Sequence, residues 1–303
     1  MIVIEQISEL RKHLDALRAQ GKSVGFVPTM GYFHAGHRSL MQAACAAHDV
    51  VVVSIFVNPL QFGSGEDIDR YPRDPMGDEL VASQEGVDIM FAPSVAEMYP
   101  NGEPLTTVHV ESLSAGLCGA SRPGHFNGVA TVVSKLFSIV GPCVSYFGRK
   151  DFQQLAVIRR MVDDLNLPVE VVGCPLVREP DGVAMSSRNS YLSAPERDAA
   201  SVLSRALRSG AEAVMGGERD PATLRRLVGN CILTAEAVRL EYVEVVRSGD
   251  LGPLERLDGE VLVALAAHVG ATRLIDNMIL TIDAETVTAD LGVTESETSC
   301  AAR

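Results

Sequence analysis

Two histidines with two residues between them, His34 and His37, follow a short apolar run at 24–27 and a turn that contains Gly31. From the second histidine onward, apolar residues recur at helical spacing, so the pattern predicts a strand, a turn and then a helix. The free N–H groups at the start of such a helix, with the positive end of its dipole, favour an anion such as a polyphosphate. Because Gly31 and Gly36 lack a Cβ atom, a ligand can approach the backbone closely there.

The two imidazoles can both face such a ligand. Each can donate a hydrogen bond or a proton as negative charge develops on phosphate in a transition state. The residue pattern therefore indicates a nucleotide-phosphate site, with a pair of histidines on a surface loop as the alternative.

Further residues suited to phosphate occur later in the chain. Lys150 follows an apolar run at 143–147, a position from which its ammonium group can neutralise phosphate oxygens. Ser186, Ser187 and Arg188 offer two hydroxyl donors and a guanidinium group, which together can hold a triphosphate. The alternatives are a solvated surface lysine and an ordinary polar turn.

Polar side chains in apolar surroundings indicate a second ligand. A buried amide such as Gln61 or Gln154 needs hydrogen-bond partners, and a hydroxyl-bearing acid would supply both donors and acceptors. A core amide satisfied within the protein is the alternative. Asn58 lies in the same turn as Gln61 and can orient a substrate or an amine. Arg122 and His125 offer a cation and a polar ring to a small amino acid, although His125 could instead cap the helix that follows.

Strands and helices that position these residues are also indicated. Unbroken apolar runs at 49–57, 87–91 and 143–147 are typical of parallel strands buried on both faces. Segments with a helical apolar stripe, at 127–140 and 153–165, follow in alternation. The alternation predicts a doubly wound α/β fold with a mostly parallel, Rossmann-like sheet that binds ligands at the carboxyl ends of its strands.

After residue 175 the pattern changes. Segments 195–215 and 221–237 are predicted to be helical, and 240–246 and 260–267 are predicted to be strands, which indicates a smaller α+β domain.

Three parts of the chain are therefore expected. A ligand-binding α/β domain spans 1–175, and the smaller domain spans 176–280. From residue 281 the chain is acidic and rich in Thr, Ser and Ala, so 281–303 is predicted to be a disordered tail.

Composition narrows the class of protein. A chain of 303 residues with 47% hydrophobic residues can fill two cores, so two domains are expected. The formal charge of -13 argues against nucleic acid as a partner, because a phosphate backbone requires a basic surface. Local lysines and arginines must therefore bind any small anion.

The six cysteines are widely scattered without a Cys-x-x-Cys pair, so neither a zinc site nor a disulfide framework is predicted. No apolar stretch reaches the ~20 residues of a membrane helix, and the N-terminus lacks the layout of a signal peptide. We expect a cytoplasmic protein that is not bound to a membrane.

Five segments together resemble the pantothenate synthetase family, of the His-x-Gly-His nucleotidyltransferases, in order and spacing. Each motif is weak by itself, whereas five in register are not expected by chance. The resemblance covers residues 1–280 and is carried by the segments 28–37, 58–62, 122–126, 147–155 and 185–189.

The resemblance implies an ATP-dependent ligase that joins pantoate to β-alanine and forms pantothenate. In this family the pantoate carboxylate attacks ATP to give a pantoyl adenylate and pyrophosphate, and the β-alanine amine then displaces AMP. The family also implies Mg²⁺ bound with ATP, held by phosphate oxygens and water and not by a metal site of the protein. It further implies a homodimer whose smaller domain closes over ATP.

The resemblance also assigns roles to residues of this chain. His37 is the implied catalytic proton donor, and Gln61 and Gln154 are the implied pantoate-binding residues. The implied β-alanine-binding residues are Asn58, Gln61, Arg122 and His125. The implied ATP-binding residues are Met30, Gly31, His34, Gly36, His37, Gly148, Lys150, Asp151, Val177, Met185, Ser186, Ser187 and Arg188.

Two other functions fit parts of the pattern. Another His-x-Gly-His transferase would make a nucleotide cofactor or charge tRNA, but the acidic charge and the paired glutamines argue against it. A regulator that binds adenine nucleotides at a decayed site would lack some of the five segments, and all five are present.

Overall fold

The computed structural model describes residues 1–63 and 65–295. The N-terminal part of the chain is built on a six-stranded parallel sheet with the strand order β1-β4-β3-β2-β5-β6. The chain runs outward from β2 through β3 and then continues on the other side of β2 with β5. The carboxyl ends of β2 and β5 therefore form the switch point at which α/β sheets bind ligands. The strands are β1 (Ile2–Ile4), β2 (Val24–Thr29), β3 (Val50–Ile55), β4 (Ile89–Phe91), β5 (Cys143–Gly148) and β6 (Val169–Cys174).

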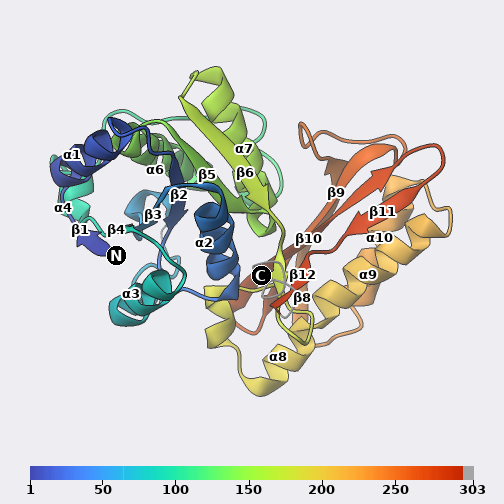
Figure 1. Ribbon diagram of the computed structural model, residues 1–303. Coiled ribbons are helices and arrows are strands. Elements are labelled where there is room, and N and C mark those ends of the chain that lie inside the picture. The colour runs from blue at the N-terminus through green and yellow to red at the C-terminus, as the bar shows by residue number, and fades with distance from the viewer. Residues whose placement is uncertain (64, 296–303) are drawn as a thin grey trace.

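Helices cover both faces of this sheet (Figure 1). Val50 and Val52 of β3 pack into the core beneath α1, α6 and α7, whereas Val51 and Val53 pack into the core beneath α2 and α3. The unbroken valine run is thus buried on both sides, as expected of a parallel strand. The helices are α1 (Ile7–Arg18), α2 (Ala35–Ala47), α3 (Pro75–Gln84), α4 (Val95–Met98), α5 (Cys118–Ser121), α6 (His125–Val140) and α7 (Phe152–Asp164), with single 3₁₀ turns η1 (Pro59–Gln61) and η2 (Arg149–Asp151).

The C-terminal part is built on a four-stranded antiparallel sheet with the order β11-β10-β9-β8. One face packs against α9 and α10 and forms a second core. The opposite face contacts the N-terminal part of the chain, where Leu262 and Ile279 pack with Phe152. Figure 1 shows this sheet between the N-terminal part and α9 and α10. The elements are α8 (Ala194–Ala200), α9 (Val202–Met215), α10 (Pro221–Ile232), β8 (Val238–Arg247), β9 (Gly259–Val269), β10 (Thr272–Ile282) and β11 (Val287–Asp290).

A small parallel sheet joins the end of the described chain to the segment between the domains. In it β7 (Val177–Arg178) pairs with β12 (Val293–Thr294). Val177 and Met185 are joined by a backbone hydrogen bond of 2.9 Å, so a hairpin leads from β7 to the turn η3 (Ser187–Tyr191).

The prediction of a disordered tail over 281–303 is wrong as far as residue 294. Asp283 accepts hydrogen bonds from the N–H groups of Glu285 and Thr286 at 2.9 and 2.7 Å and closes a turn into β11. The acidic and threonine residues thus cap a turn here. Val287 packs on the second core, which places the segment firmly on the domain. Residues 296–303 of the predicted tail lie outside the described residues.

The predicted α/β fold with a smaller C-terminal α+β part is confirmed. Among the described residues, no helix has the length and apolar character needed to cross a membrane.

Candidate active site

The turn after β2 is held by polar side chains beneath it. The Thr29 hydroxyl donates to the Ser54 carbonyl at 2.7 Å and accepts from the Gly31 N–H at 3.1 Å. Gly31 has a φ of 82°, and a Cβ atom on it would lie 2.8 Å from the Asp78 carboxylate. Glycine is therefore required at this position by backbone conformation and by space.

Asp78 of α3 was not predicted to contribute to the site. Its carboxylate is 3% exposed and accepts from the N–H groups of Tyr32 and Phe33 at 2.8 and 2.6 Å. Burial raises the pKa of Asp78, and these two hydrogen bonds oppose the shift. The carboxylate fixes the path of the chain into α2.

His34 and His37 cap the N-terminus of α2 reciprocally. Nδ1 of His34 accepts from the Gly36 N–H at 3.2 Å, and Nδ1 of His37 accepts from the His34 N–H at 3.4 Å. The ring centroids are 4.1 Å apart. An imidazole that accepts at Nδ1 carries its proton on Nε2 when it is neutral. Both rings therefore offer an Nε2–H donor, and neither Nε2 atom has a partner among the described residues.

The two imidazoles are held neutral at physiological pH. Burial, His37 and Lys150 lower the pKa of His34 to about 2. Burial and Lys150 lower the pKa of His37 to about 4, against the opposite effect of Asp151. The pair thus donates hydrogen bonds without carrying charge until an anion binds and raises these pKa values.

Lys150 supplies the positive charge next to the imidazoles. It lies in η2, directly after β5, and its side chain is 20% exposed with the ammonium nitrogen 3.8 Å from the Asp151 carboxylate. Lys150 lines the same cavity as both histidines, and its charge lowers their pKa values. The switch point between β2 and β5 therefore collects a helix N-terminus, two neutral donors and a cation.

The Ser186–Arg188 loop lies opposite this edge. The Ser186 hydroxyl accepts from the Arg188 N–H at 3.3 Å, and the Ser187 hydroxyl lies 3.2 Å from the Tyr71 hydroxyl. The Arg188 guanidinium group makes two hydrogen bonds of 2.9 Å with the Asp67 carboxylate.

A cavity of about 220 Å³ lies between the histidines and this loop. It is lined by fourteen of the predicted residues: Met30, His34, Gly36, His37, Gln61, Gly148, Lys150, Asp151, Gln154, Val177, Met185, Ser186, Ser187 and Arg188. Gly31 and Asn58 do not line this cavity.

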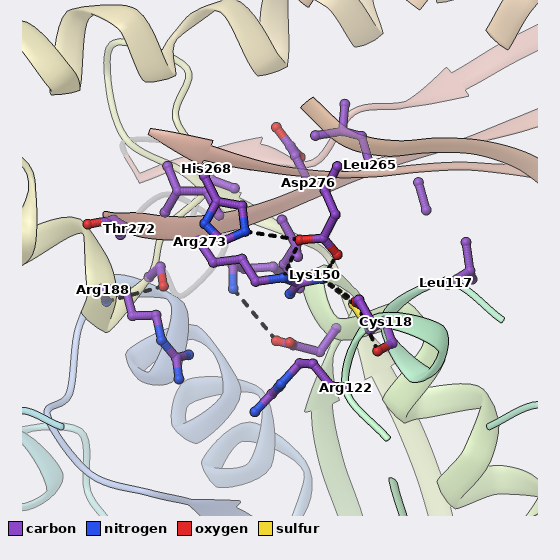
Figure 2. Close-up of a pocket in the computed structure, with 18 of the residues that line it drawn as sticks. Leu117, Cys118, Arg122, Lys150, Arg188, Leu265, His268, Thr272, Arg273 and Asp276 are labelled. Carbon is purple, nitrogen blue, oxygen red and sulfur yellow. Dashed lines mark hydrogen bonds and ion pairs between the residues drawn. The ribbon is translucent and has the colours of Figure 1, made fainter. Parts of the chain in front are cut away.

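A second cavity of about 390 Å³ continues between the N-terminal part of the chain and the C-terminal sheet. Figure 2 shows Arg122, Lys150 and Arg188 around it, with His268 and Arg273 on the side of the C-terminal sheet. Lys150 and Arg188 line both cavities, so ligands in the two spaces would meet beside these side chains.

The two predicted glutamines differ in their surroundings. Gln61 is 8% exposed, and its carbonyl oxygen accepts from Asn58 at 3.2 Å, whereas its NH₂ group contacts the Met30 sulfur at 3.1 Å. Thioether sulfur is a weak acceptor, which leaves the Gln61 donors available to a better partner. No hydrogen bond joins the Gln154 side chain to another described residue. Its neighbour Gln153 is a core amide that bonds Leu113 and Gly116.

Asn58 is satisfied within the protein. Its side chain is 1% exposed, donates to Gln61 and to the Gly128 carbonyl, and accepts from the Tyr99 hydroxyl at 2.8 Å. Its direct partner in the site is the Gln61 amide, which it orients.

Arg122 and His125 form one hydrogen-bonded group with Gln61. His125 Nδ1 lies 2.8 Å from the backbone carbonyl oxygen of Gln61, and its Nε2 lies 3.0 Å from the Arg122 guanidinium group. Burial and Arg122 lower the pKa of His125 to about 4. The alternative of a helix cap at His125 is not observed, because Gly124 occupies the N-cap of α6.

Two acidic residues on the loop after η1 were missed by the sequence reasoning. Glu66 makes two hydrogen bonds with Arg122 at 2.7 and 2.5 Å, in the same way that Asp67 engages Arg188. Both arginines predicted to bind substrates are thus paired with carboxylates. In the sequence these residues belong to a short acidic stretch between two motifs. Such a stretch is typical of a solvated loop, so it gives no local sign of the two arginine partners.

The C-terminal sheet contacts the first domain at α5. Arg273 donates to Glu241 twice at 2.9 Å and to the Ser121 hydroxyl at 3.3 Å. The Tyr242 hydroxyl lies 3.1 Å from the Cys118 sulfur. The residues in these contacts line the larger cavity, and Figure 2 shows Cys118 and Arg273 among them.

A doubly wound sheet with uncharged donors, a lysine and an arginine loop at its switch point defines a nucleotide-binding α/β enzyme. The chain belongs to the pantoate-beta-alanine ligase family, whose match covers residues 2–279.

Individual relatives agree with this family. The chain is 57% identical over 282 residues to the pantothenate synthetase of Heliobacterium modesticaldum. This alignment covers 93% of this chain and 100% of the relative. The crystal structure of pantothenate synthetase from Thermus thermophilus superposes with a TM-score of 0.87 at 47% identity, covering 91% of this chain and 98% of that one. The crystal structure of a pantoate-beta-alanine ligase from Francisella tularensis, complexed with beta-gamma ATP and beta-alanine, superposes with a TM-score of 0.76 at 33% identity. The superposition covers 91% of this chain and 97% of that one. The predicted family and ligase class are therefore confirmed.

Proposed function

We propose that this ligase condenses pantoate with β-alanine at the expense of ATP and releases pantothenate, AMP and pyrophosphate. The observation that carries the proposal is the cavity at which His34, His37, Lys150 and the Ser186–Arg188 loop meet Gln61 and Gln154. Phosphate-binding groups and amides suited to a hydroxy acid adjoin there, which is the requirement for activating an acid on a nucleotide.

In the first step a carboxylate oxygen of pantoate attacks the α-phosphorus of ATP, and the bond to pyrophosphate breaks. Negative charge builds on the phosphate oxygens during this step. The Nε2–H groups of His34 and His37 and the ammonium group of Lys150 stabilise it, with His37 as the catalytic donor. The amides of Gln61 and Gln154 hold the hydroxy acid.

In the second step the amine of β-alanine attacks the activated carbonyl carbon, and AMP leaves with the bonding electrons. Arg122 offers a guanidinium group to the β-alanine carboxylate, and His125 orients that arginine. Asn58 acts through the Gln61 amide. No protein nucleophile is needed, since the adenylate already carries the leaving group.

Other residues around the nucleotide would shape its cavity and leave the binding of Mg²⁺ to the phosphates. The nucleotide cavity is shaped by Met30, Gly36, Gly148, Asp151, Val177 and Met185. Gly31 allows the turn after β2 that leads to the histidines. Of the carboxylates nearby, Glu66 and Asp67 are engaged by arginines and Asp151 lies 3.8 Å from the Lys150 ammonium group. Mg²⁺ would therefore be held by phosphate oxygens and water and would neutralise phosphate charge.

The same family membership supports three further proposals. We propose a homodimer, a cytoplasmic location, and a division into an N-terminal domain ending near residue 175 and a smaller domain that closes over ATP. Sedimentation equilibrium tests the first of these.

Exchange of labelled pyrophosphate into ATP tests the proposed reaction. With pantoate present and β-alanine absent, the proposal requires exchange, because the acid is activated before the amine is needed. A nucleotide-binding regulator would show none. Exchange that needs β-alanine, or that proceeds equally well with unrelated carboxylic acids, contradicts the mechanism or the substrate.

A further inference from the structure

Asn277 of β10 contacts the two backbone carbonyl groups that flank the Cα atom of Lys150. Its side chain is buried, with 5% of the residue exposed, and its NH₂ group donates to the carbonyls of Arg149 and Lys150 at 3.0 and 2.8 Å. The strand belongs to the C-terminal sheet, whereas Lys150 belongs to the first domain. A residue far away in the sequence thus fixes the backbone of the candidate phosphate-binding lysine.

The geometry suits an amide side chain. A single 3₁₀ turn such as η2 leaves carbonyl groups without partners inside the turn. An uncharged NH₂ group brings two N–H donors on one atom and can serve two adjacent carbonyls at once. A charged donor in this place would add a cation beside Lys150 and would carry a desolvation cost.

Asn277 is itself held by a buried ion pair. The neighbouring Asp276 accepts two hydrogen bonds from Arg178 at 2.8 and 2.9 Å, and the side chains are 2% and 5% exposed. The same guanidinium group donates to the Asn277 carbonyl at 3.4 Å and to the Gly182 carbonyl at 3.0 Å.

Gly182 lies in the hairpin that leads from β7 to Ser186. A bridge between Arg178 and Ala184 closes this hairpin just before the loop. The ion pair therefore supports the serine and arginine loop, while its neighbour Asn277 supports the lysine turn.

We propose that Asn277 is a positioning residue for Lys150, and that through the adjoining Arg178–Asp276 ion pair it keeps the lysine in register with the Ser186–Arg188 loop. This inference rests on the proposed role of Lys150 in binding ATP phosphates. A charge is useful to a transition state only at the correct place, and a displacement of about 1 Å can cost about 10²-fold in rate.

The experiment is a double-mutant cycle in the pyrophosphate exchange assay with the full chain. We expect Asn277→Ala to lower the exchange kcat by about 10-fold to 10²-fold and to leave the KM for pantoate within about 2-fold. In the background of Lys150→Ala, the same change is expected to cost no more than about 2-fold, because the residue it positions is gone.

Asp290→Asn is the matched control. Asp290 also reaches the η2 turn from the C-terminal sheet, but it does so through a partly exposed ion pair of 3.0 Å with the Arg149 side chain. It leaves the backbone carbonyls untouched, so exchange should stay within about 2-fold of the native rate. Each rate is divided by the folded fraction obtained from thermal unfolding.

Asn277→Asp provides a second variant of the same shape. It replaces donors by acceptors facing two carbonyl oxygens, so its exchange should fall at least as far as with Asn277→Ala. Equal losses for Asn277→Ala in both backgrounds, or a loss no larger than that of Asp290→Asn, would overturn the inference. Full exchange by Lys150→Ala would instead refute the proposed role of the lysine.

Discussion

Lowering the pH should destabilise the free protein through its neutral histidines. The pKa of His37 is about 4 and that of His34 about 2, against 6.5 for an ordinary histidine. Between pH 4 and 6.5 the unfolded chain therefore binds more protons than the folded one, and the free energy of unfolding falls as the pH falls. From pH 7 to pH 5 the loss is about 2 kcal/mol for each such imidazole, and His125 adds a similar amount.

The assay is urea unfolding at pH 7 and pH 5 for matched variants. His37→Asn keeps an acceptor for the His34 N–H but removes the titrating ring. Its loss of stability between the two pH values should be about 2 kcal/mol smaller than that of the native chain. His13→Asn is the matched control for replacing a histidine, because His13 is exposed on α1 and lies outside the site.

An equal pH dependence of the native chain and His37→Asn would refute the reasoning, because it would mean that the ring titrates normally in the folded state. Saturating ATP provides a further check. A bound polyphosphate favours the charged imidazoles, so it should reduce the loss of stability at pH 5.

Three other predictions concern activity and stability. His37→Ala should lower the rate of adenylation by ~10²-fold or more with the fold retained, and a folded variant with a near-native rate would remove this residue from the mechanism. Gln61→Ala and Gln154→Ala should raise the KM for pantoate far more than the KM for ATP, whereas equal increases would contradict their assignment to the acid. Deletion of 283–303 should lower the melting temperature by several degrees, because β11 and β12 pair with the body of the protein. An unchanged melting temperature would show that these strands contribute no stability.

The first half of the fold could be predicted from the sequence because its strands are buried on both faces. The run at Val50–Ile55 has no polar interruption until Ser54, and the histidine pair marks the start of α2 directly. Both signals are local, since a strand period and a helix cap depend on residues next to each other.

The strand β10 was missed for a physical reason. Asp276 and Asn277 interrupt its apolar run, and each is buried because a partner elsewhere in the chain satisfies it. A buried polar residue with a distant partner has the same local pattern as a loop residue. The roles of Glu66 and Asp67 have no local signal for the same reason, since these carboxylates contact arginines 56 and 121 residues away.

The sequence could predict which residues form the site, but not which residues they pair with. Motif positions identified the groups around the nucleotide cavity, and the structure brings most of them together. The protonation states and tautomers of the histidines depend on burial and on the N–H groups that donate to each Nδ1 atom. Only the packed structure defines these surroundings.

The pairing of β12 with β7 bears on how the chain folds during synthesis. Arg178, at the base of the candidate phosphate-binding loop, donates to the carbonyl of Leu291, which is 113 residues further along the chain. At a synthesis rate of about 5–20 residues per second, that partner emerges roughly 6–23 s later. The first domain can therefore become compact on the ribosome while the base of this loop still lacks its last strand. The hairpin from β7 and the Ser186–Arg188 loop acquire this support only after residue 294 has been synthesised, so a chain truncated before that residue is not expected to bind nucleotide.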